Sequence, residues 1–274
     1  MRYVSFIDNG VPCWGRLDGE TITDLSAVAP DLKTAIANGL PGPDAGGRTL
    51  SLGDVELAPV IPNPGKIFCV GHNYESHRVE TNRAKTDHPS IFIRFADTLV
   101  GANGPIVRPA VSSDFDFEAE LAVVIGKGGR AISEDDAMAH VAGISCFNDV
   151  SVRDWQWHSR QFTPGKNFPA TGPFGPALVT LDEIADLDAV SVESYLNGEC
   201  MQSATLDHML FPISVVISYI SQFTPLSPGD VIATGTPGGV GAKRNPPVWL
   251  KPGDDIEIRV TGVGSLFNRV VEEG

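Results

Sequence analysis

The chain has 274 residues, of which 42% are hydrophobic and 20% are charged, and its net charge is −14. This balance is typical of a globular protein with one large domain and room for a small second one. An acidic surface repels phosphate backbones and anionic lipids, so we expect neither a nucleic acid nor a membrane as a partner. Four widely spaced cysteines without a Cys-x-x-Cys pair argue against a zinc or redox site. The N-terminal residues contain no apolar signal-peptide run, so we expect a cytoplasmic protein.

The first 60 residues are expected to form a small β-rich domain. Short apolar runs alternate with turn sequences over residues 1–25, which predicts a meander of hairpins. A short helix is predicted at residues 31–38, before Gly39. Residues 57–64 are rich in proline and resemble a linker. We therefore predict one domain at residues 1–60 and a second at residues 61–274.

Strand sequences dominate the second domain. The runs that are short and rich in β-branched residues are 66–70, 90–94, 117–125, 177–180, 191–196, 230–234 and 255–260. A buried helix is predicted at residues 212–222, where apolar residues recur with helical spacing. Weaker helices are predicted at residues 134–142 and 150–157. The chain is therefore expected to be α+β and mainly β.

A histidine-rich segment, GHNYESHRVE, follows directly on the first of these strands. His77 and Glu80 are three residues apart, so on a helix they share a face and can touch. A carboxylate beside an imidazole raises its basicity and fixes its orientation, as a general base requires. An ordinary surface charge pair has the same spacing. A zinc site made of His72 and His77 is disfavoured because a third soft ligand is missing.

Acidic residues occupy every second position between residues 114 and 120. In a strand, Asp114, Asp116, Glu118 and Glu120 would project from one face. Four like charges in a row are unfavourable unless solvent or a cation compensates them, and oxygen ligands suit Mg²⁺, Mn²⁺ or Ca²⁺. A solvated outer face explains the same pattern. The apolar run at residues 121–126 places the acids at the mouth of a buried strand and favours a site.

Three later features leave more than one interpretation open. Asp149 opens a polar and aromatic run, where it fits either a helix N-cap or a third metal ligand. Lys166 lies in a loop of glycine and proline and is either solvated or placed to stabilise an oxyanion. The glycine-rich residues 235–241 lack both nucleotide-binding patterns, so we exclude a phosphate-binding loop.

Several segments, taken in chain order, resemble the fumarylacetoacetate hydrolase superfamily across about residues 62–270. They are GHNYESHRVE, FDFEAELAVVIG, FNDVSVRDWQ, PGKNFPATGPFGP, LNGECMQSATLDHMLF, LSPGDVIATGTPGGVG and LKPGDDIEI. The resemblance is to the smaller bacterial branch of acylpyruvate hydrolases and 2-hydroxyhepta-2,4-diene-1,7-dioate isomerases. It implies an α+β, mainly β fold, in which a mixed β-sandwich roll carries a small β-rich N-terminal domain. It also implies a homodimer with one Mg²⁺ or Mn²⁺ per active site.

The resemblance assigns roles to individual residues. The implied metal ligands are Glu118, Glu120 and Asp149, with Asp114 and Asp116 as neighbours. The implied catalytic residues are His77 and Glu80, on a segment that closes as a lid, and Lys166. The implied substrate-binding residues are Arg153, Gln156, Gln202 and Thr236. Arg94 stands where many relatives have lysine, and it either contacts the distal end of the substrate or is structural.

The implied reaction is metal-dependent hydrolysis of the C–C bond of a 2,4-dioxo acid, of the acylpyruvate or fumarylpyruvate type, to pyruvate and a carboxylic acid. His77, held by Glu80, would take a proton from water, and Lys166 with the metal would stabilise the enolate. The same chemistry supports oxaloacetate decarboxylation or isomerisation of a 2-hydroxy-dienoate, and a non-catalytic binding protein is a further alternative. Trp155 and Trp157 either line an apolar distal pocket or pack in the core.

Overall fold

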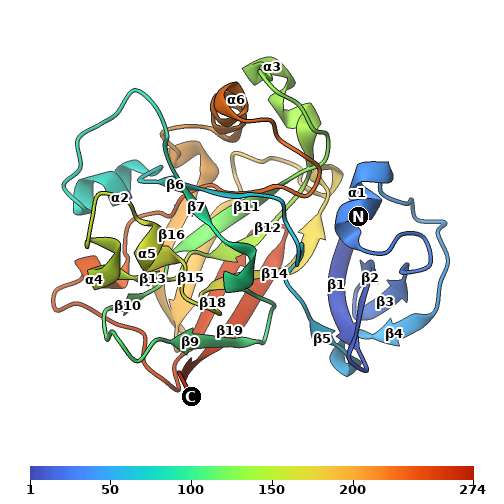
Figure 1. Ribbon diagram of the computed structural model, residues 1–274, viewed down its shortest axis with the longest axis horizontal. Helices are drawn as coiled ribbons and strands as arrows, with labels where there is room; N and C mark the ends of the chain where they lie inside the picture. Colours follow the sequence, from blue (N-terminus) through green and yellow to red (C-terminus); the bar gives the residue numbers. More distant parts are fainter.

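The computed structural model describes residues 1–274 and confirms the mainly β, α+β class (Figure 1). The strands of the large sheet, in spatial order, are β4 (Thr49–Ser51), β3 (Thr21–Asp24), β2 (Val11–Asp18), β1 (Arg2–Asp8), β14 (Gly172–Val179), β12 (Val141–Asn148), β11 (Ala119–Ile125), β17 (Val231–Ala233), β6 (Ile67–Gly71) and β7 (Ser90–Arg94), with β5 (Glu56–Leu57) paired to β1 and β8 (Leu99–Val100) to β14. Parallel and antiparallel pairs both occur, so the sheet is mixed.

A second sheet packs against this one. Its strands are β16 (Glu199–Thr205), β15 (Ser191–Leu196), β18 (Asp255–Val260), β19 (Gly264–Glu272) and β9 (Pro105–Arg108). In β15 and β18 every second residue is buried, because one face of each strand turns toward β11 and β12 and the other toward solvent. The central strand β11 is buried on both faces and contributes side chains to two separate hydrophobic clusters.

The N-terminal residues form the predicted meander of β1, β2 and β3, followed by the predicted helix α1 (Leu32–Asn38). Asp31 begins this helix by accepting a hydrogen bond from the Thr34 N–H at 2.7 Å. β1 pairs antiparallel with β14, so the meander extends the large sheet. It lies at the end of the molecule opposite α2 and α4 (Figure 1). The division into residues 1–60 and 61–274 stays a prediction.

The helices are few and short. They are α2 (Glu75–Glu80), α3 (Glu134–Ala137), α4 (Arg153–Gln156), α5 (Thr163–Lys166) and α6 (Ile213–Phe223), with single 3₁₀ turns at η1 (Leu52–Asp54), η2 (Ala96–Thr98), η3 (Met138–His140), η4 (Leu181–Glu183), η5 (Leu206–His208) and η6 (Gly241–Lys243). α6 confirms the helix predicted at residues 212–222. No helix is both long enough and apolar enough to cross a bilayer.

Two of the predicted helices are wrong in part. The helix predicted at residues 134–142 ends early, because β12 begins at Val141 and pairs with both β11 and β14. The helix predicted at residues 150–157 is a two-residue strand, β13 (Ser151–Val152), followed by the short α4. In both places pairing with distant strands outweighs local helical preference. The strands β9, β12, β16 and β19 were not predicted.

The strand predicted at residues 117–125 is interrupted. β10 (Phe115–Asp116) pairs with β13, and β11 begins only at Ala119. At the interruption the Phe117 N–H donates to Asp116 Oδ1 at 2.9 Å, and the Glu118 N–H donates to Asn148 Oδ1 at 3.0 Å. Side chains thus replace the missing ladder bonds, as buried backbone groups require. Asp116 and Glu118, on either side of the break, both pair with Arg153.

Candidate functional site

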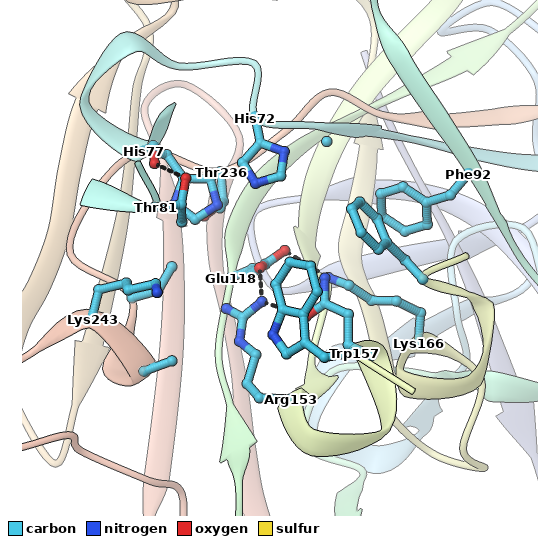
Figure 2. A pocket seen from close by; sticks show the side chains of 15 residues that line it. His72, His77, Thr81, Phe92, Glu118, Arg153, Trp157, Lys166, Thr236 and Lys243 are labelled. Carbon is cyan, nitrogen blue, oxygen red and sulfur yellow. Dashed lines mark hydrogen bonds and ion pairs between the residues drawn. The ribbon is translucent and has the colours of Figure 1, made fainter. Parts of the chain in front are cut away.

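A cavity of about 530 Å³, including its open mouth, lies where α2, α4 and α5 meet the glycine-rich segment (Figure 2). Its walls come from residues 71–81, 92, 118, 153–166 and 236–243, which are far apart in the sequence. The cavity therefore collects most of the segments that the sequence singled out.

Three buried carboxylates converge beside this cavity. Ligand oxygens of Glu118, Glu120 and Asp149 all lie within 4.8 Å of one another. The register of β11 on β12 pairs Ala119 with Asn148, and the Asp149 N–H donates to the Glu118 carbonyl at 3.0 Å. This register brings Asp149 next to the two glutamates. The structure thus assembles the predicted ligand set, which we call the triad.

Glu118 is balanced by two cations. Arg153 Nη1 lies 2.6 Å from Glu118 Oε1, and Lys166 Nζ lies 2.7 Å from Glu118 Oε2. Burial by itself would raise the pKa of the Glu118 carboxyl, but Lys166 and Arg153 outweigh it and hold that pKa well below its usual range. Glu118 is therefore a carboxylate at all physiological pH values.

Glu120 has no such balance. Its Oε2 accepts a hydrogen bond from the Gly235 N–H at 2.9 Å, and no lysine, arginine or histidine pairs with it. Burial, followed by repulsion from Asp149 and Glu118, raises the pKa of the Glu120 carboxyl well above its usual value. Glu120 is thus the member of the triad whose negative charge the chain itself does not neutralise.

With Glu120 ionised, the buried charges around the triad leave an excess of one negative charge. The buried carboxylates are Asp116, Glu118, Glu120 and Asp149, and the buried cations are Arg94, Arg153 and Lys166. Oxygen ligands in this number suit a hard divalent cation. A cation of charge +2 would reverse the excess to +1 and would make the cavity attractive to an anion. The donor set therefore fits Mg²⁺ or Mn²⁺.

Lys166 and Arg94 hold Asp149 from two sides. Lys166 Nζ donates to Asp149 Oδ2 at 2.6 Å, and Arg94 donates to Asp149 Oδ1 through Nε at 2.9 Å and Nη2 at 2.6 Å. Arg94 also donates to the Thr171 hydroxyl and the Val150 carbonyl, and it does not line the cavity. Of the two roles considered for Arg94, the structure supports the structural one.

His77 and Glu80 touch on α2, as their spacing predicts. His77 Nδ1 lies 2.6 Å from Glu80 Oε1, and Glu80 Oε2 accepts the Gly239 N–H at 2.8 Å. Ser76 Oγ accepts the Gly238 N–H at 3.0 Å, so α2 is fastened to the glycine-rich segment at two points. Because Nδ1 is engaged, Nε2 is the ring nitrogen of His77 left to exchange a proton.

His72 is a site residue that the sequence did not single out for this cavity. Its ring stacks on His77 with centroids 5.2 Å apart and an interplanar angle of 13° (Figure 2). Burial, followed by repulsion from His77, lowers the pKa of His72 to about 4. His72 is therefore neutral at neutral pH and covers one face of His77 without competing for protons.

The predicted substrate-binding residues divide into two groups. Arg153, Gln156 and Thr236 line the cavity. Arg153 Nε donates to Asp116 at 2.8 Å and Nη1 donates to Gln156 Oε1 at 3.0 Å, whereas Nη2 lies 2.8 Å from Asp116 without making a hydrogen bond. Asp116, Glu118 and Gln156 therefore hold the Arg153 guanidinium in the cavity wall.

Gln202 corrects the sequence prediction, because it does not line the cavity. Its Nε2 donates to Thr236 Oγ1 at 2.7 Å and to the Pro237 carbonyl at 2.8 Å. Its Oε1 accepts the Ala119 N–H and the Ser194 hydroxyl, both at 3.0 Å. With its side-chain polar atoms engaged, Gln202 positions Thr236 rather than contacting a ligand.

The two tryptophans have different positions. Trp157 lines the cavity, whereas Trp155 packs edge-on against Phe168 with centroids 5.2 Å apart. Phe92 and Phe162 complete an apolar wall, with their rings 5.5 Å apart. The sequence indicated Trp157 for such a wall, but it did not indicate Phe92 or Phe162, because periodicity does not reveal which strand or loop faces a cavity.

Comparisons with known proteins match both the N-terminal part and the rest of the chain. The family model "Fumarylacetoacetate (FAA) hydrolase C-terminal" matches residues 66–271, and the model "Rv2993c-like, N-terminal" matches residues 1–59. The mitochondrial oxaloacetate tautomerase FAHD2A of Bos taurus is 42% identical over 270 residues, which cover 93% of this chain and 85% of that protein. Because that relative is described as mitochondrial, a cytoplasmic location stays a prediction.

Among the solved structures that cover this chain completely are a hydrolase and an isomerase by name. The fumarylacetoacetate hydrolase EaFAH from Exiguobacterium antarcticum has a TM-score of 0.89 at 35% identity, with 100% of both chains covered. The 2-hydroxyhepta-2,4-diene-1,7-dioate isomerase from Mycobacterium marinum has a TM-score of 0.83 at 32% identity, with 100% of this chain and 99% of that chain covered. The names of the similar proteins thus include a tautomerase, a hydrolase and an isomerase.

Proposed function

The chain belongs to the fumarylacetoacetate hydrolase family, and we propose that it is a divalent-metal-dependent enzyme that moves a proton at C3 of a 2-oxo acid. The reaction that we propose is interconversion of the enol and keto forms of oxaloacetate. The observation that carries the proposal is the His77–Glu80 contact at 2.6 Å, placed in the wall of a cavity that also exposes Glu118 and Lys166. The similarity to the Bos taurus oxaloacetate tautomerase supports this choice of substrate.

The proton balance of this reaction matches the cavity. The enol has a hydroxyl on C2 and a double bond between C2 and C3. Ketonisation breaks that O–H bond and forms a C–H bond at C3, so one proton moves and nothing is oxidised. His77 gives its Nε2 proton to C3 and regains one from the 2-hydroxyl through solvent, while Glu80 holds the ring and stabilises its charged form.

Negative charge on the 2-oxygen needs positive charge nearby. Lys166 is fully buried, and Asp149 and Glu118 outweigh the effect of its burial and raise its pKa, so it remains an ammonium ion. The Arg153 guanidinium lies in the same wall, where Glu118 and Asp116 hold it. Glu118, Glu120 and Asp149 would hold the cation, which when bound supplies further positive charge for the 2-oxygen. Lys166 and Arg153 orient the carboxylate end of the acid.

Hydrolysis of an acylpyruvate is the second candidate, supported by the similarity to EaFAH, whose name is that of a hydrolase. The same His77 Nε2 would then remove a proton from water instead of giving one to C3. The two reactions differ in products, because hydrolysis releases pyruvate and an acid, whereas tautomerisation releases neither. Oxaloacetate decarboxylation differs again, because it releases CO₂.

The test follows the loss of enol-oxaloacetate absorbance with Mn²⁺, against the spontaneous rate and an EDTA control. The same preparation is offered acetylpyruvate and fumarylpyruvate, and pyruvate and CO₂ are measured. We expect EDTA-sensitive ketonisation that exceeds any release of pyruvate or CO₂. EDTA-sensitive pyruvate from an acylpyruvate, without ketonisation, would replace the tautomerase with the hydrolase.

Matched variants test the role of the dyad. His77→Gln and Glu80→Gln should each lower kcat by roughly 10²–10⁴-fold, the usual contribution of a positioned general acid or base. His208→Gln is the control, because His208 is exposed and does not line the cavity. Full activity of His77→Gln would remove the dyad from the mechanism.

A further inference from the structure

The lysine in η6 differs from every other cation in the cavity wall. Arg153 pairs with Asp116 and Glu118, and Lys166 pairs with Glu118 and Asp149. Lys243 lines the same cavity but makes no ion pair and no side-chain hydrogen bond. Figure 2 shows its side chain reaching from the glycine-rich segment toward the interior of the cavity. Lys243 is therefore the cation whose charge is available to a ligand.

The backbone that carries Lys243 is firmly held. Asp116, which also holds Arg153, accepts the N–H of Gly241 at 2.8 Å and the N–H of Ala242 at 3.0 Å. A Cβ on Gly241 would lie 1.9 Å from the Val248 carbonyl oxygen, so this close approach requires glycine. One buried carboxylate thus fixes the positions of both Arg153 and the turn that bears Lys243.

The charges in the cavity suit a ligand with two anionic ends. The triad with Lys166 and Arg153 forms one charged region, which the proposed function assigns to the 2-oxo acid end. Phe92, Phe162 and Trp157 supply apolar wall with no charge to bind a second anion. Arg83 is stacked on Trp157, with its guanidinium 4.8 Å from the ring centroid, and it does not line this cavity. Lys243 is the remaining candidate for a second carboxylate.

We propose that Lys243 binds the distal carboxylate of a dicarboxylic 2-oxo acid and selects such acids over monocarboxylic ones. This inference rests on the proposed function for the orientation of the substrate. Lys243 is exposed, so water competes for its ammonium group and the effect is modest. We expect loss of its charge to lower kcat/KM for a dicarboxylate roughly tenfold. This factor corresponds to the lower end of the free-energy range for a hydrogen bond to a charged group.

The test compares Lys243→Met, Lys243→Arg and the control Lys251→Met. Lys251 is an exposed lysine outside the cavity wall, so its replacement changes the net charge equally. Turnover is measured with oxaloacetate and with its 4-ethyl ester, which lacks the distal charge. Binding is measured calorimetrically with malate and lactate, which do not react and differ only by the distal carboxylate that malate carries on C3.

In Lys243→Met, the preference for oxaloacetate over its ester and for malate over lactate should fall by roughly tenfold, mainly through KM. Lys243→Arg and Lys251→Met should keep both preferences. Preferences that survive in Lys243→Met, or a wild-type protein that does not bind malate more tightly than lactate, would overturn the proposal. If the wild type converts neither substrate but the malate preference depends on Lys243, the tautomerase fails and the carboxylate site stands.

Discussion

Replacing Glu120 with glutamine removes the one triad carboxylate that has no cationic partner within the chain. Glu120 is buried and accepts only the Gly235 N–H, a bond that a glutamine oxygen can also accept. Without metal, we expect Glu120→Gln to be as stable as the wild type or slightly more stable, because a neutral amide replaces a buried carboxyl whose charged form is disfavoured. Glu118→Gln is the matched contrast, because it leaves Arg153 and Lys166 short of a buried partner.

The sizes of these effects follow from burial and chain length. Breaking a buried ion pair by removing one partner costs about 3–5 kcal/mol. At about 2.1 cal/mol/K per residue, the chain has an unfolding entropy of roughly 0.6 kcal/mol/K near Tm. Glu118→Gln should therefore lower the metal-free Tm by roughly 5–8 °C. A metal at a hundred times its Kd adds about 2.7 kcal/mol, which raises the wild-type Tm by roughly 5 °C.

The assay is thermal unfolding at pH 7 with EDTA and with Mn²⁺ over a concentration series. The wild type should show the metal-dependent rise, and both variants should lose most of it. Only Glu118→Gln should also have a lower Tm in EDTA. Glu118 and Glu120 do not differ in charge balance as described if Glu120→Gln is destabilised in EDTA as much as Glu118→Gln. Glu120 is not a metal ligand if Glu120→Gln keeps the full response to Mn²⁺.

Three further changes test other parts of the site. Arg94→Met should lower Tm by roughly 5–8 °C, because it leaves Asp149 without one of its buried partners. Arg94→Lys keeps the charge and should lower Tm less. Equal Tm values for the two variants would show that charge pairing at this position does not contribute to stability. His72→Asn should reduce the loss of stability on acidification, measured by urea unfolding between pH 7 and pH 5. In the folded wild type the pKa of His72 is about 4, below its value of 6.5 in the unfolded chain. The unfolded chain therefore binds the proton first, and stability falls as the pH drops from 6.5 toward 4. An unchanged dependence of stability on pH in the variant would contradict this. Gly239→Ala should lower both Tm and kcat, because φ is +107° and a Cβ would lie 2.3 Å from the Met201 carbonyl oxygen. Gly253→Ala, with φ of +94° and open space, should lower Tm but not kcat, because the backbone strain costs about 1–2 kcal/mol of stability.

Local patterns predicted the elements whose form depends on neighbouring residues. The alternation of β15 and β18 and the helical spacing of α6 appear in the sequence because one face of each element is buried. The His77–Glu80 contact follows from a spacing of three residues on a helix. Strand β12 was missed because its apolar run follows a helical turn, and only its pairing with β11 and β14 makes it a strand.

The sequence by itself determined the fold class, the family resemblance and the acids of the triad, because each depends on residue types in a local order. The tertiary structure alone decided which acid lacks a cation, because Lys166 and Arg94 reach Asp149 from 17 and 55 residues away. It also placed Gln202 behind Thr236 and left Lys243 without a partner. Ion pairs and hydrogen bonds between distant segments depend on strand register and on the path of the loops. A linear sequence does not specify which partner each charge will meet.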